Sequence, residues 1–525
     1  MIMMICKDHV RILQSLSFSM LVLFFPAAES HAATCDSLQA LSLPNTTITS
    51  AQPVAAGAFS SPDAGRQGAP PTADFKQLPA FCRVTATLRP SLDSDIKIEV
   101  WLPLANWNSK FQGVGNGGLA GFINYTAGRG SIERGMAEAL LRGYATASTD
   151  TGHIGGTAAP FLGHPEKLVD FAYRAVHEMT VTAKAIVRAF YDTAPKLSYW
   201  NSCSTGGRQG LMKAQRFPDD YDGIIAGAPA ISQTRLVTWS THVGHAALKE
   251  PPSMIPPSKY PMIHRAVMNA CDAVDGLTDG LIADPRSCRF DFKTTECNGG
   301  DSASCLTAAQ VGTAQTLTDP LLHPKTGETI YPGLAWGTEL GWAVRIGGPT
   351  PQFFGPEYFK YVFYKDPNWD WRTFDLEAAV AISDRADFRM LNATDPDLKK
   401  FQQRGGKLLL YHGWSDANFS AQLTIDYYER VRAVVGSERI DDWIRLFLAP
   451  GMGHCGGGAG PNAFDPVAAL EQWVEHGRAP ASIIAAHTTD GKVDRTRPLC
   501  PYPQVARYNG TGSIDEAGSF TCRLP

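Results

Sequence analysis

The sequence predicts an α/β fold in which a single large insertion interrupts one domain. Segments with the alternating pattern of a strand or the spacing of an amphipathic helix follow one another up to residue 227, and they resume after residue 395. Residues 228–395 are rich in Pro, Trp, Gly, Asp and Cys and show no clear alternation of strands and helices. Strand–helix alternation on both sides of an irregular stretch is typical of an α/β domain with one insertion.

Residue patterns predict the elements of the first part in order. Polar and apolar side chains alternate over 93–104 as in a strand, and 110–114 and 143–149 look like further strands. Apolar residues recur near helical spacing over 168–192, which predicts a long amphipathic helix. We then expect a strand at 197–200, a helix over 207–215 and a buried strand at 222–227.

The second part repeats the alternation. We expect strands at 406–411 and 443–448 and helices over 419–434 and 464–476. The expected domains are therefore a core in two parts, 33–227 and 396–525, and an inserted domain over 228–395. Because the insertion follows the nucleophile region described below, we expect it to cover the active site as a lid.

Composition restricts the class of partner. The chain has 525 residues, and 44% of them are apolar, which is enough for a large core and excludes wholesale disorder. Lys and Arg number 47 and Asp and Glu number 51, so the net charge is -4. Without an excess of basic residues, we expect no nucleic-acid partner.

Residues 1–32 have the three-part pattern of a secretory signal peptide. Lys7 and Arg11 precede an apolar run over 12–25, and Ser30 and Ala32 are the small residues of a cleavage site. The alternative, an uncleaved anchor, is disfavoured because a membrane span needs ~20 apolar residues. We expect a secreted or periplasmic protein that is not held in a membrane after cleavage.

Cysteine usage agrees with export. The chain has 11 cysteines, and removal of Cys6 with the signal peptide leaves an even number, which predicts up to five disulfides in an oxidising compartment. Zinc binding is the competing use of cysteine, but the sequence has neither a CxxC nor an HxxxH motif.

The segment over 200–208, WNSCSTGGR, has the pattern of a nucleophile elbow. A strand enters, small residues turn sharply, and a helix leaves. The tight turn requires small residues two positions before and after the nucleophile, and Ser202 and Gly206 meet this need around Ser204. Ser202 replaces the usual glycine at its position. The backbone N–H of Thr205 would then belong to an oxyanion hole.

Two later strands end in residues that complete a catalytic triad. The strand within KLLLYHGWSDAN is followed by Asp416, and the strand within WIRLFLAPGMGHC is followed by His454. Catalytic groups collect at the carboxyl ends of strands in open α/β sheets. The order Ser, Asp, His is that of α/β-hydrolases. We expect Ser204 to attack an acyl carbon, His454 to transfer the proton and Asp416 to orient His454.

The placement of two cysteines is specific to this arrangement. Cys203 precedes Ser204, and Cys455 follows His454. A triad brings Ser and His together, so their neighbours are close enough for a disulfide, whose Cα atoms lie ~4.4–6.8 Å apart. The rival interpretation makes Cys203 the nucleophile. The elbow pattern favours Ser204, and an oxidising compartment would pair the thiol.

A glycine-rich loop over 113–121, GVGNGGLAG, follows an early strand and offers a second oxyanion donor. Glycine allows close approach of the backbone to a ligand. Gly117 or Gly118 is the candidate, with Gly118 preferred, and a plain glycine turn is the alternative.

The insertion contains a loop that carries three carboxylates and two glycines. Asp272, Asp275 and Asp279, with the carbonyls of Leu277 and Leu281, form an oxygen set of the kind that Ca²⁺ prefers. The spacing is not that of an EF-hand, and it suits a solvated turn equally. His153, His177 and His264 are interpreted as structural or surface residues.

The motif Cys203-Ser204, Asp416 and His454-Cys455 resembles that of the tannase and feruloyl esterase family. This resemblance covers nearly the whole mature chain and implies an α/β-hydrolase core with a lid inserted after the nucleophile. It also implies a structural calcium at 272–281 in that lid. The remaining disulfides that it implies are Cys35–Cys82, Cys271–Cys288, Cys297–Cys305 and Cys500–Cys522.

The resemblance implies a secreted serine esterase for small esters of aromatic acids, with feruloyl or related phenolic esters first. A tannase and a hydrolase of terephthalate monoesters are the enzymatic alternatives. The alternative from another class is a catalytically dead, calcium-stabilised binding protein, which the intact Ser204, Asp416 and His454 disfavour. The sequence leaves the preferred acid, the alcohol and the oligomeric state open.

Overall fold

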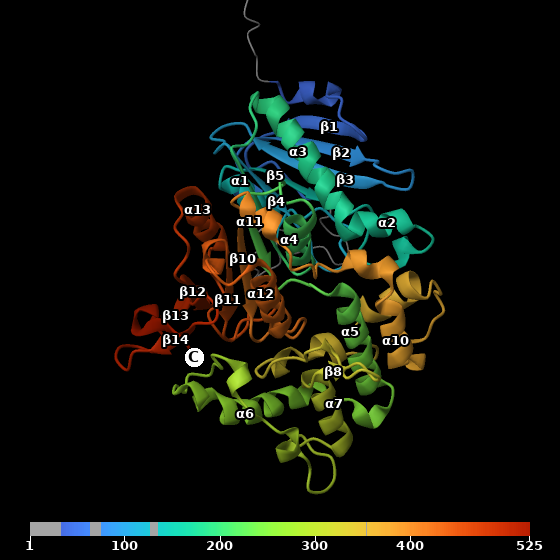
Figure 1. Cartoon of the computed structure of the whole chain (residues 1–525), viewed down its shortest axis with the longest axis vertical. Helices are drawn as coiled ribbons and strands as arrows, with labels where there is room; N and C mark the ends of the chain where they lie inside the picture. The colour runs from blue at the N-terminus through green and yellow to red at the C-terminus, as the bar shows by residue number, and fades with distance from the viewer. Residues whose placement is uncertain (1–32, 63–74, 127–134, 353) are drawn as a thin grey trace, which may run out of the picture.

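A nine-stranded mixed sheet forms the centre of the protein (Figure 1). The computed structural model describes residues 33–62, 75–126, 135–352 and 354–525, so the predicted signal peptide lies outside the described residues. In spatial order the strands are β1 (Thr46–Val54), β2 (Phe81–Leu88), β3 (Ile96–Pro103), β5 (Ala145–Thr149), β4 (Lys110–Val114), β6 (Leu197–Cys203), β7 (Gly223–Gly227), β10 (Lys407–Gly413) and β11 (Ile444–Ala449).

The strand pairing changes once across the sheet, from antiparallel to parallel. β1, β2, β3 and β5 pair antiparallel, whereas neighbours from β5 through β11 pair parallel. The carboxyl ends of β6, β10 and β11 therefore lie at one edge of the sheet. This edge is where an open α/β sheet collects its catalytic groups.

Helices cover both faces of the sheet. The helical segments of the core are α1 (Gly135–Leu141), α2 (Pro165–Val169), the π-helical turn η4 (Asp170–Arg174), α3 (Ala175–Tyr191), α4 (Thr205–Arg216), α11 (Lys399–Gln403), α12 (Ala421–Val435) and α13 (Pro466–His476). Side chains of α3, α4 and α12 share one apolar cluster with the sheet, and those of α1 and α13 share another. Ile224 of β7 belongs to the first cluster and Ile225 to the second, because successive strand residues point to opposite faces.

Residues 228–395, which we call the inserted segment, fall between β7 and β10 in the sequence and lie beside the sheet and below it in Figure 1. It is mainly helical, with one short hairpin: α5 (Gln233–Leu248), α6 (Tyr260–Cys271), α7 (Ala308–Thr318), β8 (Leu321–Leu322), β9 (Thr329–Tyr331), α8 (Ala343–Ile346), α9 (Phe354–Glu357) and α10 (Leu376–Ser383). Its own apolar cluster includes Trp239, Tyr331 and Trp342. The absence of strand–helix alternation in its sequence thus reflects helices packed on helices.

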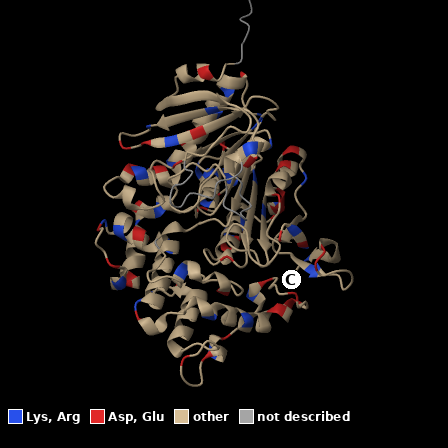
Figure 2. Ribbon diagram, turned by 180° about the vertical axis from the view of Figure 1, so that it is seen from behind, with Lys and Arg blue, Asp and Glu red and all other residues tan. Residues whose placement is uncertain are grey.

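The C-terminal region adds two hairpins outside the main sheet. They are β12 (Ile483–Thr489) with β13 (Lys492–Leu499), and β14 (Val505–Tyr508) with β15 (Phe520–Arg523). Figure 2 shows basic and acidic residues interspersed over the ribbon. Within the described ranges, no helix has the length and apolar character that crossing a membrane requires.

The α/β fold class is confirmed, and the predicted core elements coincide with observed ones. The predicted helix over 168–192 is a helical run from Pro165 to Tyr191 that contains the π-helical turn η4. The predicted strand at 197–200 extends to Cys203, so it delivers the chain directly to Ser204.

Candidate active site

Ser204 lies in a sharp turn between β6 and α4. Its backbone has φ 64° and ψ -124°, a conformation that non-glycine residues rarely adopt and that is typical of a strained elbow. Gly206 is required on the next turn, because a Cβ atom there would collide with the side chain of Ser202. The small residues that the sequence pattern demands at 202 and 206 therefore face each other across the elbow.

The structure brings the three predicted triad residues together. His454 Nε2 lies 2.9 Å from Ser204 Oγ, and His454 Nδ1 lies 2.7 Å from Asp416 Oδ2. Asp416 is 1% exposed and Ser204 is 9% exposed, so the chain of hydrogen bonds begins in the interior at Asp416 and ends at a serine with little exposure to solvent. This geometry can move a proton from a serine hydroxyl to an imidazole whose orientation a carboxylate holds.

Asp416 is held as a carboxylate by its neighbours. The N–H groups of Asn418 and Phe419 donate to Oδ1 at 2.7 and 3.0 Å. Burial alone would raise the pKa of Asp416, but the charge of His454 and the hydrogen bonds from His412 and His454 outweigh it and hold that pKa well below its ordinary value.

His412 is a member of this network that sequence reasoning missed. Its ring is fully buried, with Nε2 3.1 Å from Asp416 Oδ2 and Nδ1 2.8 Å from Thr424 Oγ1. The available signal was a histidine inside the otherwise apolar strand KLLLYHG, where an unpaired imidazole would be costly.

The two predicted oxyanion residues are also neighbours. Thr205 is the first residue of α4, so its backbone N–H has no acceptor within the helix, and its Oγ1 donates to the carbonyl of Gly118. Gly118 has φ +55°, in the left-handed region that favours glycine. Gly117 and Gly118 line the same cavity as Ser204 and Thr205.

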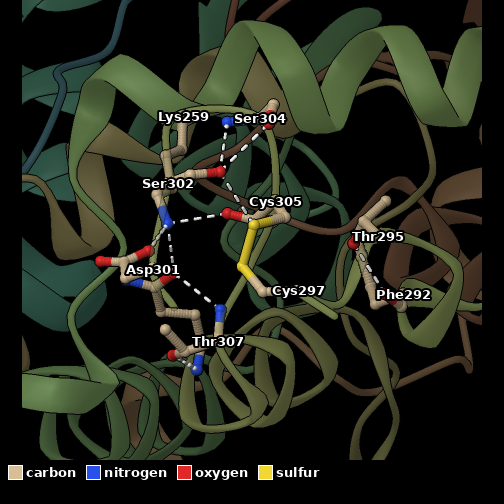
Figure 3. The surroundings of a disulfide bond; sticks show 10 residues. Lys259, Phe292, Thr295, Cys297, Asp301, Ser302, Ser304, Cys305 and Thr307 are labelled. Carbon is tan, nitrogen blue, oxygen red and sulfur yellow. Dashed lines mark hydrogen bonds and ion pairs between the residues drawn. A yellow bond between two sulfur atoms is a disulfide. The ribbon is translucent and has the colours of Figure 1, made fainter. Parts of the chain in front are cut away.

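All five predicted disulfide pairs are present. Cys203–Cys455 joins the serine turn to the histidine loop with Cα atoms 5.9 Å apart, so Cys203 has no free thiol to act as a nucleophile. The other pairs are Cys35–Cys82, Cys271–Cys288, Cys297–Cys305 and Cys500–Cys522. Figure 3 shows the third of these beside the buried Lys259, whose Nζ donates to the carbonyl of Cys305 and pairs with Asp301.

A cavity of about 260 Å³ opens at Ser204. Helix α5 contributes Gln233, Leu236, Val237 and Ser240 to its wall, at helical spacing, so one face of the inserted segment lies against the serine. Most of the remaining wall is apolar, from Leu119, Phe354 and Phe419.

Arg345 also lines this cavity, and sequence reasoning missed it. Its guanidinium is buried and donates to Ser240 Oγ, Gln352 Oε1 and the carbonyls of Ala417 and Asn418. Burial lowers the pKa of Arg345 to about 10. Because Ala417 and Asn418 follow Asp416, Arg345 joins the inserted segment to the loop that carries the triad acid.

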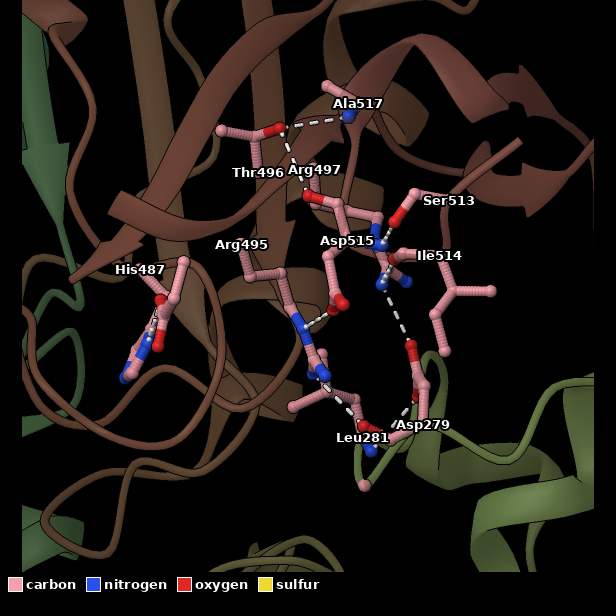
Figure 4. Close-up of polar contacts among 12 residues, drawn as sticks. Asp279, Leu281, His487, Arg495, Thr496, Arg497, Ser513, Ile514, Asp515 and Ala517 are labelled. Atoms are coloured by element: carbon pink, nitrogen blue, oxygen red, sulfur yellow. Dashed lines mark hydrogen bonds and ion pairs between the residues drawn. The ribbon is translucent and has the colours of Figure 1, made fainter. Parts of the chain in front are cut away.

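The predicted calcium loop is tied to the C-terminal hairpins. Asp279 Oδ2 lies 2.8 Å from Arg497, and Arg495 donates to the carbonyl of Asp279 (Figure 4). The carboxylate of Asp272 accepts N–H groups from Asp279 and Gly280 across the loop. In the part of the chain that the structure describes, no three His, Cys, Asp or Glu side chains are arranged to hold a metal ion.

His153, His177 and His264 lie outside the triad, although His264 lines a second cavity, whose wall also includes His454. His153 is buried with Nε2 2.8 Å from the carbonyl of Leu119, and His177 Nδ1 lies 2.9 Å from Asp220. The structural interpretation of His153 and His177 agrees with these contacts.

The fold and this edge of the sheet define an α/β-hydrolase. A sheet of this topology carries a serine at the strand–helix elbow and an acid and a histidine after two later strands. The sequence model described as "Tannase and feruloyl esterase" matches residues 82–523. The chain therefore belongs to the tannase and feruloyl esterase family, and it is a carboxylic ester hydrolase.

Relatives at more than 30% identity agree. The chain is 37% identical to an uncharacterized esterase of Xanthomonas campestris pv. campestris, over 94% of this chain and 92% of that protein. It is 35% identical to feruloyl esterase B of Aspergillus niger, over 84% of this chain and 86% of that protein. The crystal structure of feruloyl esterase B from Aspergillus oryzae matches with a TM-score of 0.85 at 32% identity and covers 93% of this chain and 99% of that chain.

Proposed function

We propose that Ser204, His454 and Asp416 hydrolyse esters of phenolic acids through an acyl-enzyme. The observation that carries this proposal is the continuous pair of hydrogen bonds from Ser204 through His454 to Asp416, at 2.9 and 2.7 Å. Ser204 Oγ attacks the ester carbonyl while its proton passes to His454 Nε2. The C–O bond to the alcohol then breaks, and His454 gives the proton to the departing oxygen.

Water completes the cycle. His454 takes a proton from water, whose oxygen attacks the acyl carbon, and the bond to Ser204 Oγ breaks with return of the proton to that oxygen. In both halves the carbonyl oxygen becomes negative, and the N–H groups of Thr205 and Gly118 stabilise it. Donors fixed in a site that excludes water are worth more than the same donors in solution.

Ferulate and related phenolic acids are the proposed acyl groups. The apolar wall of the 260 Å³ cavity accepts an aromatic ring. Gln233 Oε1 in that wall is buried and makes no hydrogen bond within the described residues, so it can accept one from a phenolic hydroxyl. The relatives named feruloyl esterase B support the same acid.

A terephthalate monoester is the second candidate, and Arg345 is the observation that favours it. No acidic side chain pairs with Arg345 in the described part of the chain, and a carboxylate on the acyl group would supply the missing charge. The four neutral acceptors that Arg345 already contacts weigh against this candidate.

A comparison of kcat/KM distinguishes the phenolic esterase, tannase and terephthalate activities. The three substrates are methyl ferulate, methyl gallate and a terephthalate monoester.

Replacement of the nucleophile tests the mechanism. Ser204→Ala removes the attacking oxygen, and in subtilisin the corresponding loss costs on the order of 10⁶ in kcat. We expect unchanged folding by circular dichroism and no measurable hydrolysis of methyl ferulate. Cys203→Ala is the matched control, because it should lower stability without abolishing activity. Retention of more than a few per cent of activity by Ser204→Ala would exclude the proposed nucleophile.

The inserted segment is proposed to act as a lid, and the loop 272–281 within it as a structural calcium site. The loop supplies oxygen donors, the kind that a hard cation prefers, although its carboxylates are not arranged around a metal position in the described residues. Burial and the charges of Asp279 and Asp272 raise the pKa of Asp275. The ion pair between Asp279 and Arg497 competes with a cation for the Asp279 carboxylate. Chelation should lower Tm but leave activity intact at low temperature, and metal analysis that finds no calcium would contradict the site.

Export is proposed from two observations. Residues 1–32 have a signal-peptide pattern, and the described chain holds five disulfides, which persist in oxidising compartments. N-terminal sequencing of the protein recovered from periplasm or medium should begin at Ala33. A sequence that begins at Met1 would mean that the segment is retained.

A further inference from the structure

The loop over 117–121, which carries the proposed oxyanion donor, contains a tight turn. The N–H of Ala120 donates to the carbonyl of Gly117 at 3.0 Å and closes that turn. Gly118 and Ala120 have φ of +55° and +44°, in the left-handed region. Glycine adopts this region freely, whereas alanine does so at a cost. Contacts from outside the turn must therefore hold Ala120 in place.

The planar peptide units of this turn pass their orientation from one to the next. In a trans peptide, the carbonyl and the following N–H point in opposite directions. Because the carbonyl of Gly117 points to Ala120, the N–H of Gly118 points away from it. No backbone carbonyl of the described residues accepts this N–H, and Gly118 lines the cavity at Ser204. The direction of the proposed donor thus depends on the peptide unit between Leu119 and Ala120.

His153, in the loop after β5, holds that peptide unit. The carbonyl of Leu119 belongs to the same plane as the N–H of Ala120, and His153 Nε2 lies 2.8 Å from this carbonyl oxygen. A carbonyl can only accept a hydrogen bond, so Nε2 carries the proton. Burial lowers the pKa of His153, which is 4% exposed, and so favours the neutral ring.

The ring of His153 is itself firmly held. It packs edge-to-face against Phe161 and Phe171, with ring centroids 4.9 and 6.0 Å away. The loop that carries it also bonds the glycine-rich loop through its backbone, since the N–H of Gly155 donates to the carbonyl of Gly121 at 3.1 Å. The imidazole therefore gives the carbonyl of Leu119 a donor with a fixed position.

We propose that His153 is a positioning residue for the oxyanion hole. The inference rests on the proposed function, in which the N–H of Gly118 stabilises the negative oxygen. His153 is not among the described residues that line the cavity at Ser204, so it acts through the two peptide units. A donor aimed at the oxygen of the transition state affects the rate of the chemical step more than the binding of substrate.

Two esters that differ in one atom test the inference: methyl ferulate and its thiono analogue, in which sulfur replaces the carbonyl oxygen. Sulfur accepts hydrogen bonds weakly, so the oxyanion hole contributes less to hydrolysis of the thionoester. We expect His153→Phe to lower kcat for methyl ferulate roughly tenfold with little change in KM, because displacing a donor costs less than the about 100- to 1000-fold of deleting one. The ratio of kcat/KM for the ester to that for the thionoester should fall by a similar factor.

Three further variants complete the experiment. His153→Gln keeps an N–H donor near the position of Nε2 and should recover most of the rate and of the ratio. His177→Gln is the matched control, because His177 bonds to Asp220 instead of to the glycine-rich loop, so kcat and the ratio should not change. If His153→Phe fails to fold, His153→Asn takes its place, because its shorter side chain fits the same space without reaching Leu119.

The outcomes separate this inference from the proposed function. An equal fall for both esters would mean that His153 supports only the fold, and an unchanged kcat would mean that the reaction does not need it. Either result overturns the inference, while hydrolysis of methyl ferulate by the wild type keeps the proposed function. If the wild type hydrolyses neither ester, the proposed function fails and the inference fails with it.

Discussion

Ser204, His454 and Asp416 come from three loops that follow β6, β11 and β10, and each side chain is fixed by contacts beyond the triad. Asp416 accepts two backbone N–H groups on one oxygen and two histidines on the other. Sequence order and motif were sufficient to predict that these three side chains meet. His412 could not be assigned, because its role depends on the side chain of Asp416 folding back four residues to meet it.

His412 is predicted to be a positioning residue. His412→Phe removes a hydrogen bond to a buried carboxylate, a loss of about 1.5–3 kcal/mol, which should lower kcat roughly 10- to 100-fold with little change in KM. His412→Gln keeps an N–H donor and should recover part of the rate. Thr424→Val, which removes only the partner of His412 Nδ1, should have the smaller effect. Equal loss in the Phe and Gln variants would mean that the hydrogen bond is unimportant.

Asp150 should make stability depend on pH. Burial raises the pKa of Asp150 to about 7, although the N–H groups of Gly152 and Lys97 oppose the shift. The folded state therefore binds the proton more tightly than the unfolded state, so this residue lowers stability as pH rises from about 4 to about 7.

The measurement is the free energy of unfolding of wild type and Asp150→Asn across this range. The difference should grow in favour of the variant up to pH 7, by at most about 4 kcal/mol, and then level off. Asp219→Asn is the control, because the side chain of Asp219 is 94% exposed. A constant difference between wild type and Asp150→Asn would show that Asp150 does not titrate there.

At the scale of elements, the active site depends on where strands end. Residue patterns predicted β3, β4, β5, β6, β7, β10 and β11, and the signal is strongest for β7, β10 and β11, whose apolar runs are each followed by a turn. β1 and β2 were not predicted. β1 is an edge strand whose partly exposed residues include Pro53, so its pattern gives a weak strand signal.

The disulfide between the serine and histidine loops should affect both rate and stability. Replacing Cys203 and Cys455 by alanine frees two loops whose separation sets the distance between Ser204 and His454, so kcat should fall more than KM rises. Loss of this cross-link, which spans 252 residues, should also lower Tm. The cross-link reduces the conformational entropy of the unfolded chain, which stabilises the folded state by roughly 5 kcal/mol at most.

Removal of Cys500–Cys522, in the C-terminal hairpins, is the control for this prediction, because it should lower Tm without a matching loss of kcat. Alkylation of both Cys203 and Cys455 in the untreated protein would contradict the bridge.

At the scale of the whole molecule, the site is assembled from the core and the inserted segment. The core supplies the triad, while α5, Arg345 and Trp336 from the inserted segment supply walls of the two cavities. The sequence predicted that residues 228–395 differ from the core but could not predict which of their side chains reach Ser204. Those contacts depend on the packing of helices that are separated in the sequence from Ser204, by 29 positions for Gln233 and by 141 for Arg345, which local patterns do not encode.

Reaction with a serine-directed phosphonate tests most directly whether Ser204 is the nucleophile. We expect one adduct per chain, located by peptide mapping at Ser204, with loss of methyl ferulate hydrolysis in proportion to labelling and no adduct in Ser204→Ala. An adduct at another residue, or full labelling with activity retained, would contradict the assignment of Ser204 as the nucleophile.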